Sequence, residues 1–196
     1  MKARDNPFAT QRTEKLAYRL PGGLTWPALL ERLKGQDYCG SIVGRHGTGK
    51  TTLLEEFVPH LKKLGFEPQL IRLKTESSMR EKEALPALLR RIVKPAFILL
   101  DGAEQLSTRH WLPVRSAAST AAGFLVTVHR VSRLPTLLEC DSNPGLLAGL
   151  VQELTGKPFP LDEATELVAR HFGDLRACLR ELYDEWGERN KGKLAA

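Results

Sequence analysis

Apolar residues in the first 140 positions form two alternating patterns, short continuous runs and stripes at helical spacing. Runs typical of strands buried on both faces predict strands at 96–100 and 123–128, and a short strand of the buried type is predicted at 38–43. Residues 69–73 are expected to form a further strand, with a short fifth at 136–140. The stripes, with apolar residues three or four positions apart, predict helices at 26–33, 50–64, 85–93 and somewhere within 104–121. Strands that alternate with helices predict an α/β domain with a mostly parallel sheet.

Single residues mark where some of these helices begin, end or bend. Thr25 is suited to cap the N-terminus of the first helix, and Gly35 is suited to end it. Pro59 lies inside the 50–64 stripe, where it predicts a kink or a break just before it.

After Asp141 only helical stripes remain. They run through 146–154, 161–172 and 175–186, and glycine and proline residues separate them. The pattern therefore predicts a small helical subdomain behind the α/β core. The expected segments are a lead-in and helix at 1–35, a nucleotide-binding core at 36–141, a helical lid at 142–188 and a basic tail at 189–196.

The composition is that of a globular protein and excludes several other classes. Of 196 residues, 42% are hydrophobic and 27% charged, and no apolar run approaches the roughly 20 residues needed to cross a bilayer. The polar start argues against a secretory signal, and Cys39, Cys140 and Cys178 are too widely spaced for a disulfide framework or zinc site. A cytoplasmic location is therefore expected. The net charge of +6 permits an anionic partner without specifying one.

The most specific signal is the string from Gly44 to Thr51, which matches G-x-x-x-x-G-K-[ST] in full. Glycines allow successive backbone N–H groups to surround a phosphate, and the following helix adds its positive end. Lys50 can then reach the β- and γ-phosphates, and the Thr51 hydroxyl can ligate Mg²⁺. The predicted nucleotide contacts are Gly44, Arg45, His46, Gly47, Thr48, Gly49, Lys50, Thr51 and Thr52.

A chance match is the alternative, and it should arise in roughly one in a hundred sequences of this length. Here a predicted strand precedes the string and a predicted helix follows it, which is the context that phosphate binding requires. The sequence therefore predicts a nucleoside triphosphate site.

A second acid for this site is expected at the end of a neighbouring buried strand. Residues 97–101 form an apolar run that ends in Asp101, which is predicted to hold the metal ion together with Thr51. The alternative is a strand-end aspartate that starts a turn with Gly102.

With these motifs the chain resembles P-loop ATPases of the AAA+ class, particularly the bacterial secretion and transposition ATPases and origin-recognition-type proteins. The resemblance implies a three-layer P-loop fold with a helical lid. In those proteins the acidic strand continues as Asp-Glu-Ala-x-x-Leu, whereas here it reads Asp101-Gly-Ala-Glu-Gln-Leu106. Gly102 replaces the glutamate that polarises the attacking water, and Glu104 is the only nearby acid that could substitute for it. The alternative for Glu104 is an acid favoured by the dipole in a helix's first turn.

The resemblance assigns further roles to residues outside the two motifs. Thr127 matches the polar sensor 1 position, with His129 beside it, and the alternative is a β-branched strand residue. Arg130 and Arg133 lie where the family often carries an arginine finger, and otherwise are solvated loop charges.

Two segments at the ends of the chain also match. Asn6-Pro-Phe8 resembles a lead-in that lies near the adenine in the secretion-type ATPases. Gly173-Asp-Leu-Arg176 resembles the sensor 2 motif, in which Arg176 would point at the γ-phosphate. Asp174 is suited to cap a helix in either case.

The predicted function is a Mg²⁺-dependent ATP-binding protein, a slow ATPase or nucleotide switch that acts on a protein or nucleic-acid partner. The alternatives are a hydrolysis-deficient nucleotide-binding scaffold, a STAND-like signalling switch and, with less support, a small-molecule kinase. ATP rather than GTP follows from the resemblance alone, and homo-oligomerisation stays open.

Overall fold

A computed structural model describes residues 6–131 and 134–191, which form two compact units. The sheet unit consists of Leu20–Gly44 and Lys50–Cys140. The helical unit consists of Arg45–Gly49 together with the described residues of Met1–Arg19 and Asp141–Ala196. Among the described residues, no helix is both long and apolar enough to cross a bilayer.

The sheet unit is built on five strands, all paired in parallel in the order β2-β3-β4-β1-β5. They are β1 (Cys39–Val43), β2 (Glu67–Arg72), β3 (Ala96–Asp101), β4 (Gly123–Val128) and β5 (Thr136–Glu139). The continuous apolar runs thus correspond to strands, and the α/β prediction with a mostly parallel sheet is confirmed.

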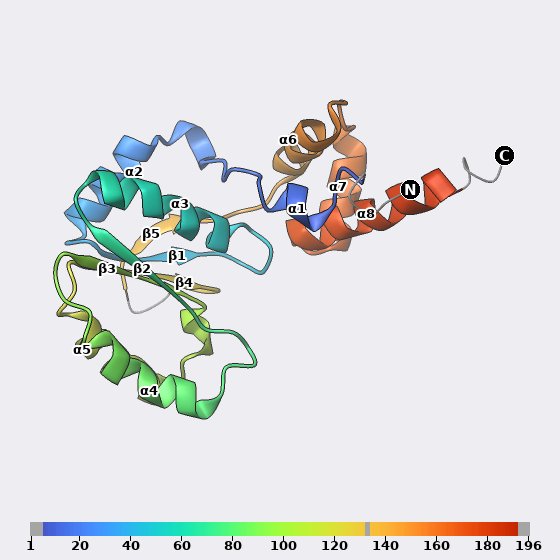
Figure 1. The fold of residues 1–196 in the computed structure, drawn as a ribbon. Helices are drawn as coiled ribbons and strands as arrows, with labels where there is room; N and C mark the ends of the chain where they lie inside the picture. Colours follow the sequence, from blue (N-terminus) through green and yellow to red (C-terminus); the bar gives the residue numbers. More distant parts are fainter. Residues whose placement is uncertain (1–5, 132–133, 192–196) are drawn as a thin grey trace. The chain divides into compact units, whose positions relative to one another are not determined.

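Helices cover both faces of this sheet. They are α2 (Trp26–Gly35), α3 (Lys50–Lys63), α4 (Met79–Leu89) and α5 (Thr108–Ala118), with short 3-10 turns η2 (Pro21–Gly23) and η3 (Ala103–Gln105). Helices α2 and α3 lie on one face and α4 and α5 on the other (Figure 1). The sandwich therefore has three layers.

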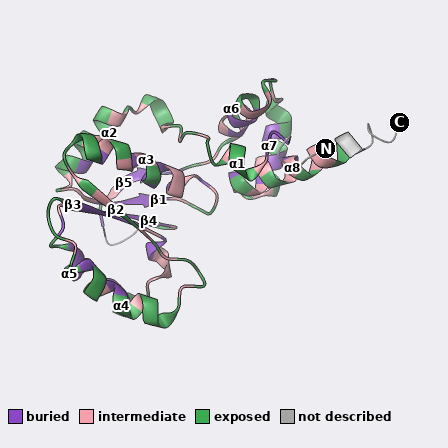
Figure 2. Cartoon of the chain, viewed as in Figure 1, coloured by how far each residue is buried: buried purple, intermediate pink, exposed green. Residues whose placement is uncertain are grey.

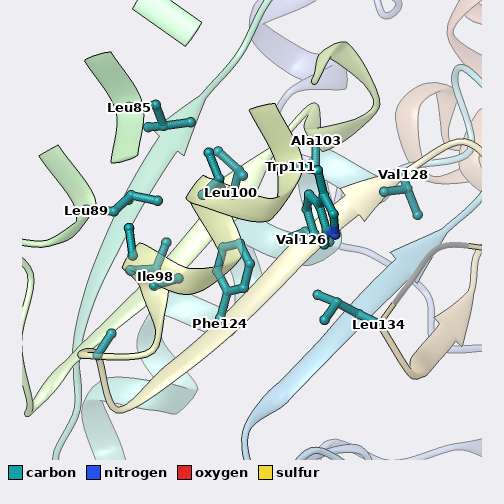
Figure 3. Packing of buried hydrophobic residues seen from close by; sticks show 14 of the residues in the cluster. Leu85, Leu89, Ile98, Leu100, Ala103, Trp111, Phe124, Val126, Val128 and Leu134 are labelled. Atoms are coloured by element: carbon teal, nitrogen blue, oxygen red, sulfur yellow. The ribbon is translucent and has the colours of Figure 1, made fainter. Parts of the chain in front are cut away.

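The central strands are the most deeply buried part of the chain (Figure 2). Every residue of β4 is buried, and so is every residue of β3 except Asp101. Against one face of these strands pack side chains from α4 and α5, among them Leu85, Leu89, Trp111 and Val114 (Figure 3). The edge strand β2 has no buried residue, which agrees with its position beside only β3.

Some of the helix boundaries that the sequence predicts for the sheet unit are confirmed, and others differ in the structure. Thr25 accepts a hydrogen bond from the backbone N–H of Ala28 as the N-cap of α2, and that helix ends at Gly35 as predicted. Pro59 lies inside α3, which continues to Lys63, so the helix does not break before it. The helix expected at 85–93 begins earlier, because Ser78 and Glu81 form a capping box at the start of α4, and it ends earlier, at Leu89.

The helical unit contains α1 (Thr10–Thr13), α6 (Pro144–Thr155), α7 (Leu161–Arg170) and α8 (Leu175–Lys191). Asn143 caps α6 by accepting the N–H of Leu146, and Gly156 ends it in the left-handed conformation. Helix α8 continues to Lys191, so the first residues of the expected tail are helical, and 192–196 lie outside the described residues.

The N-terminal segment belongs to the core of this helical unit. The Phe8 side chain is 6% exposed, and its ring makes an edge contact with Trp186 at 6.1 Å between centroids. The Asn6 side-chain amide donates to the carbonyl of Tyr183 at 2.8 Å. Asn6-Pro-Phe8 therefore ties the chain's beginning to α8.

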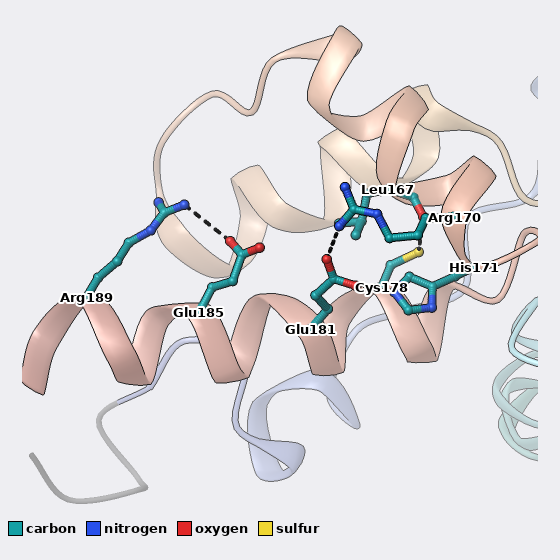
Figure 4. Close-up of polar contacts among 7 residues, drawn as sticks. All are labelled: Leu167, Arg170, His171, Cys178, Glu181, Glu185 and Arg189. Atoms are coloured by element: carbon teal, nitrogen blue, oxygen red, sulfur yellow. Dashed lines mark hydrogen bonds and ion pairs between the residues drawn. The ribbon is translucent and has the colours of Figure 1, made fainter.

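Polar contacts join α7 to α8 within the same unit (Figure 4). Glu181 on α8 accepts hydrogen bonds from Arg170 and from His171, and these contacts lower the pKa of the Glu181 carboxyl, with the His171 hydrogen bond as the largest cause. Near them, burial raises the pKa of the Cys178 thiol to about 11, which keeps it protonated at neutral pH.

Candidate functional site

The predicted phosphate loop lies between β1, which ends at Val43, and α3, which begins at Lys50. Gly47 and Gly49 have φ of 70° and 83°, the left-handed region in which glycine carries no steric penalty. The Thr48 hydroxyl donates to the carbonyl of Arg45 at 2.9 Å and holds the turn between them. Such a turn before a helix can form the concave array of N–H groups that binds an anion.

Both glycines are also in close contact with other residues of the helical unit. A Cβ on Gly47 would lie 1.8 Å from Oδ1 of Asp174, and one on Gly49 would lie 3.1 Å from the Tyr18 ring. Asp174 accepts the N–H of Ala177 at 3.0 Å, so its capping role at the start of α8 is confirmed. A side chain at position 47 would therefore collide with Asp174, whereas at position 49 the space is tight and the positive φ is the stronger reason for glycine.

The strand-end acid lies where the sequence places it, at the last residue of β3. Asp101 Oδ2 accepts a hydrogen bond from the Thr51 hydroxyl at 2.9 Å, and Oδ1 accepts one from the Thr127 hydroxyl at 2.6 Å. Thr51 comes from the first turn of α3 and Thr127 from β4. Three residues far apart in sequence thus meet at the carboxyl ends of adjacent strands, where open α/β sheets bind ligands.

These groups fit a magnesium ion. A threonine hydroxyl and an aspartate carboxylate are hard oxygen ligands, and Mg²⁺ commonly takes one or two such groups while phosphates and water complete its shell. No group of three or more His, Cys, Asp or Glu side chains suited to a metal occurs among the described residues. Any metal here would therefore depend on Thr51 and Asp101 together with the ligand's own oxygens.

Gly102 has a backbone that leaves no room for a side chain. Its φ is 82°, and its N–H donates to Thr127 Oγ1 at 2.8 Å. A Cβ at this position would lie 2.3 Å from the backbone oxygen of Leu73. A glutamate at position 102, which the resemblance would lead us to expect, could therefore fit only if the backbone at Gly102 or Leu73 moved.

Glu104, the candidate substitute, is held by a histidine. It lies on η3, and its Oε1 is 3.0 Å from Nε2 of His129, the second residue after Thr127. Its Oε2 is buried and has no hydrogen-bond partner. In the sequence His129 is two residues after Thr127, the sensor position. Only the three-dimensional structure shows that it pairs with Glu104.

The candidate arginines occupy exposed positions. Arg130 follows β4 and is exposed, and Arg176 is exposed in the first turn of α8, two residues after Asp174. Arg133 lies outside the described residues.

The sequence does not predict a role for Tyr18, whose ring lies against Gly49 of the phosphate loop. A single tyrosine in an irregular segment gives no periodic signal.

No protein-family model matches the chain, and no curated protein does. Among solved structures, the chain is similar to a point variant of RuvB from Thermotoga maritima, with 14% identity over 80% of this chain and a TM-score of 0.53. It is also similar to PCH-2 of C. elegans, with 13% identity over 79% of this chain and a TM-score of 0.44. The chain spans 58% of the RuvB chain and 62% of the PCH-2 chain. At this identity the likeness to RuvB shows the fold alone, a mostly parallel five-stranded sheet covered by helices.

Proposed function

We propose that this chain is a Mg²⁺-dependent ATP-binding protein of the AAA+ type, which works as a slow ATPase or nucleotide switch. The hydrogen bond from Thr51 Oγ1 to Asp101 Oδ2 carries the proposal. It brings the hydroxyl of the phosphate loop and the strand-end carboxylate close enough to hold one metal ion between them and a triphosphate.

In this proposal the residues from Gly44 to Thr52 bind the phosphates. Their backbone N–H groups and the start of α3 face the phosphate oxygens, and the Lys50 ammonium neutralises the β- and γ-phosphates. When bound, Mg²⁺ neutralises further charge on the phosphate oxygens. Thr127, which donates to Asp101 and accepts from Gly102, keeps that carboxylate in a fixed orientation.

Hydrolysis needs an acid to orient water, and Glu104 is the proposed residue. Arg130, from its own chain or from a second copy, and Arg176 are the proposed stabilisers of charge on the transferred phosphoryl group. Arg176 would also report the γ-phosphate to the helical unit. A protein or nucleic acid is the proposed partner, in the cytoplasm.

A nucleotide-binding scaffold without hydrolysis is the second candidate, and two observations favour it. The backbone of Gly102 has no room for the usual glutamate, and Glu104 is already paired with His129. A protein with this arrangement could bind ATP and change state without turning it over.

Calorimetry with Mg²⁺-ATP tests the proposal. The wild-type chain should bind, and Lys50→Ala should bind at least 100-fold more weakly, because a buried ammonium that contacts the phosphates is removed. Lys63→Ala, an exposed lysine at the other end of α3, is the matched control and should bind like wild type. If the folded wild-type chain takes up neither ATP nor GTP, the proposal is wrong.

Phosphate release separates the two candidates. A slow ATPase should release phosphate above the Lys50→Ala background, and Glu104→Gln should lower that rate at least tenfold. A scaffold should bind ATP and show no turnover above that background. Recording native mass with and without DNA in the same samples would show whether a nucleic acid or a second copy takes part.

A further inference from the structure

A cavity of about 530 Å³ opens in the sheet unit beside the first turns of α4 and α5. Its lining includes Met79 and Lys82 of α4, Arg109 and His110 of α5, and polar side chains of η3 and of the start of α5. No residue of the phosphate loop, which the structure describes in full, belongs to this lining. The volume is within the roughly 300–1,000 Å³ range of sites that bind small ligands.

Two cationic side chains come together in this cavity. The Arg109 guanidinium donates to Sδ of Met79 at 3.4 Å, so the side chain extends from α5 to the start of α4. Met79 and Lys82 are three positions apart on α4 and therefore lie on the same face of that helix. The contact with Met79 thus brings Arg109 to the side of α4 that carries Lys82. Because like charges repel, this arrangement favours an anion between the two side chains.

Neither cation has an acidic partner within residues 6–131 and 134–191. The thioether sulfur of Met79 is a weak acceptor, and it does not neutralise the charge of Arg109. Glu81, next to Lys82 in sequence, accepts the backbone N–H at the N-cap of α4 at 2.6 Å. Glu104 on η3 pairs with a histidine that follows β4. No acid of the described chain lines the cavity, so its positive charge has no counterpart there.

A largely buried histidine belongs to the same lining. His110 is only 9% exposed, and its Nδ1 is 2.9 Å from the Ser107 hydroxyl. That hydroxyl can donate to Nδ1, which leaves the proton of the neutral ring on Nε2. In the part of the chain that the structure describes, Nε2 has no hydrogen-bond partner. A buried side chain with an unpaired ring nitrogen, in the lining of an open cavity, indicates a ligand that accepts a hydrogen bond.

The charges and donors in this lining fit a phosphate monoester. Lys82 and Arg109 supply two positive charges, which match a monoester that carries nearly two negative charges at neutral pH. The guanidinium, the ammonium and the imidazole together offer enough donors for its three terminal oxygens, whereas a carboxylate has two oxygens and one charge. A phosphodiester also carries one charge. The start of α5 adds the partial positive charge of a helix N-terminus.

We propose that this cavity binds the terminal phosphate of a phosphorylated organic compound through Lys82, Arg109 and Nε2 of His110. A small phosphorylated molecule and the phosphorylated end of a nucleic acid present the same group, and the experiment distinguishes them. The site shares no residue with the phosphate loop, so failure at one site leaves the proposal for the other as it stands.

Nuclear magnetic resonance of the full chain can follow the two sites separately. The backbone N–H signal of His110 reports on the cavity, and those of Gly47 and Gly49 report on the phosphate loop. Phenyl phosphate, added without nucleotide or Mg²⁺, is the probe, and methyl phenyl phosphate, its diester, is the matched control. The monoester should shift the His110 signal saturably. The diester should bind about tenfold more weakly, because it has one charge and one terminal oxygen fewer.

Variants test which side chains recognise the probe. Lys82→Gln and Arg109→Gln should each weaken binding of phenyl phosphate about tenfold, because each removes a charged donor. Arg90→Gln, which changes an exposed arginine at the other end of α4, is the matched control and should bind like wild type. Lys50→Ala should leave the His110 titration unchanged. An absent or non-saturable shift, equal binding of the two probes, or loss of the His110 titration in Lys50→Ala would overturn the proposal.

Oligothymidylates with and without a 5′-phosphate distinguish the two sources of the group. If the phosphorylated strand binds more tightly than phenyl phosphate and the unphosphorylated strand does not bind, the ligand is a nucleic-acid end. If the phosphorylated strand binds no more tightly than phenyl phosphate, the ligand is a small molecule. Equal shifts of the His110 signal by both strands would show recognition of the phosphodiester backbone and would overturn the assignment to a monoester.

Discussion

The polar contacts at the strand ends of the sheet unit are buried, whereas those between α7 and α8 of the helical unit are partly exposed to solvent. In the sheet unit, Thr127 is fully buried, and its hydroxyl both donates to Asp101 and accepts from Gly102. In the helical unit, Glu181 is 24% exposed, and its partner Arg170 is 56% exposed. A buried group that loses its partner bears the full cost of desolvation, whereas an exposed one regains water. Substitutions at the strand ends should therefore cost far more than those between α7 and α8.

Gly102→Ala should produce the largest loss of stability. The substitution places a Cβ 2.3 Å from the Leu73 backbone oxygen at a residue with φ of 82°, so both the strain and the clash must be relieved. We expect a loss of about 3 kcal/mol or more in the free energy of unfolding, measured by urea denaturation. Gly102→Glu should lose at least as much and should not raise the rate of ATP hydrolysis.

Gly156→Ala in the helical unit is the matched control. Gly156 has φ of 70°, but a Cβ there would meet no atom within 4 Å. Its cost should be only the left-handed penalty, about 1 kcal/mol. If Gly102→Ala and Gly156→Ala lowered the free energy of unfolding equally, the greater cost expected at the strand ends of the sheet unit would be contradicted.

Thr127→Val should have the next largest effect. The change keeps the shape of the side chain but leaves the Gly102 N–H without its acceptor and Oδ1 of Asp101 without the Thr127 donor. A loss of about 2 kcal/mol is expected from the same urea titrations. Thr165→Val on α7, where an exposed hydroxyl donates to the Leu161 carbonyl, should stay within about 0.5 kcal/mol of wild type. A Thr127→Val chain as stable as that control would show that the strand-end hydrogen bonds add nothing to stability.

Much of the sheet unit follows from local sequence. Continuous apolar runs predict the central strands β3 and β4, because a strand covered on both faces needs apolar side chains at nearly every position. The position of Asp101 beside Thr51 also follows, since parallel strands bring their carboxyl ends to one edge. These features depend on periodicity and on strand direction, which the sequence carries directly.

Other features depend on distant packing and have no local signal. Glu104 pairs with His129 across 25 positions, and Gly47 lies against Asp174, more than 100 positions away. Phe8 reads as part of an irregular segment but lies in the core of the helical unit. No spacing in the sequence connects such residues, because the contacts arise only when whole elements pack together.

Glu181→Gln should have the smallest effect and the clearest dependence on pH. Contacts with His171 and Arg170 lower the pKa of Glu181 below its ordinary value of 4.5, so the carboxylate stabilises the folded state at neutral pH by about 1 kcal/mol. This contribution is complete above pH 4.5 and is lost as the pH falls through the lowered pKa. Melting curves of wild type and Glu181→Gln should therefore differ at pH 7 and converge towards pH 3. Glu185→Gln, which removes the acid of a more exposed pair with Arg189, should match wild type at both values, and a Glu181→Gln difference that stays constant with pH would contradict the assignment.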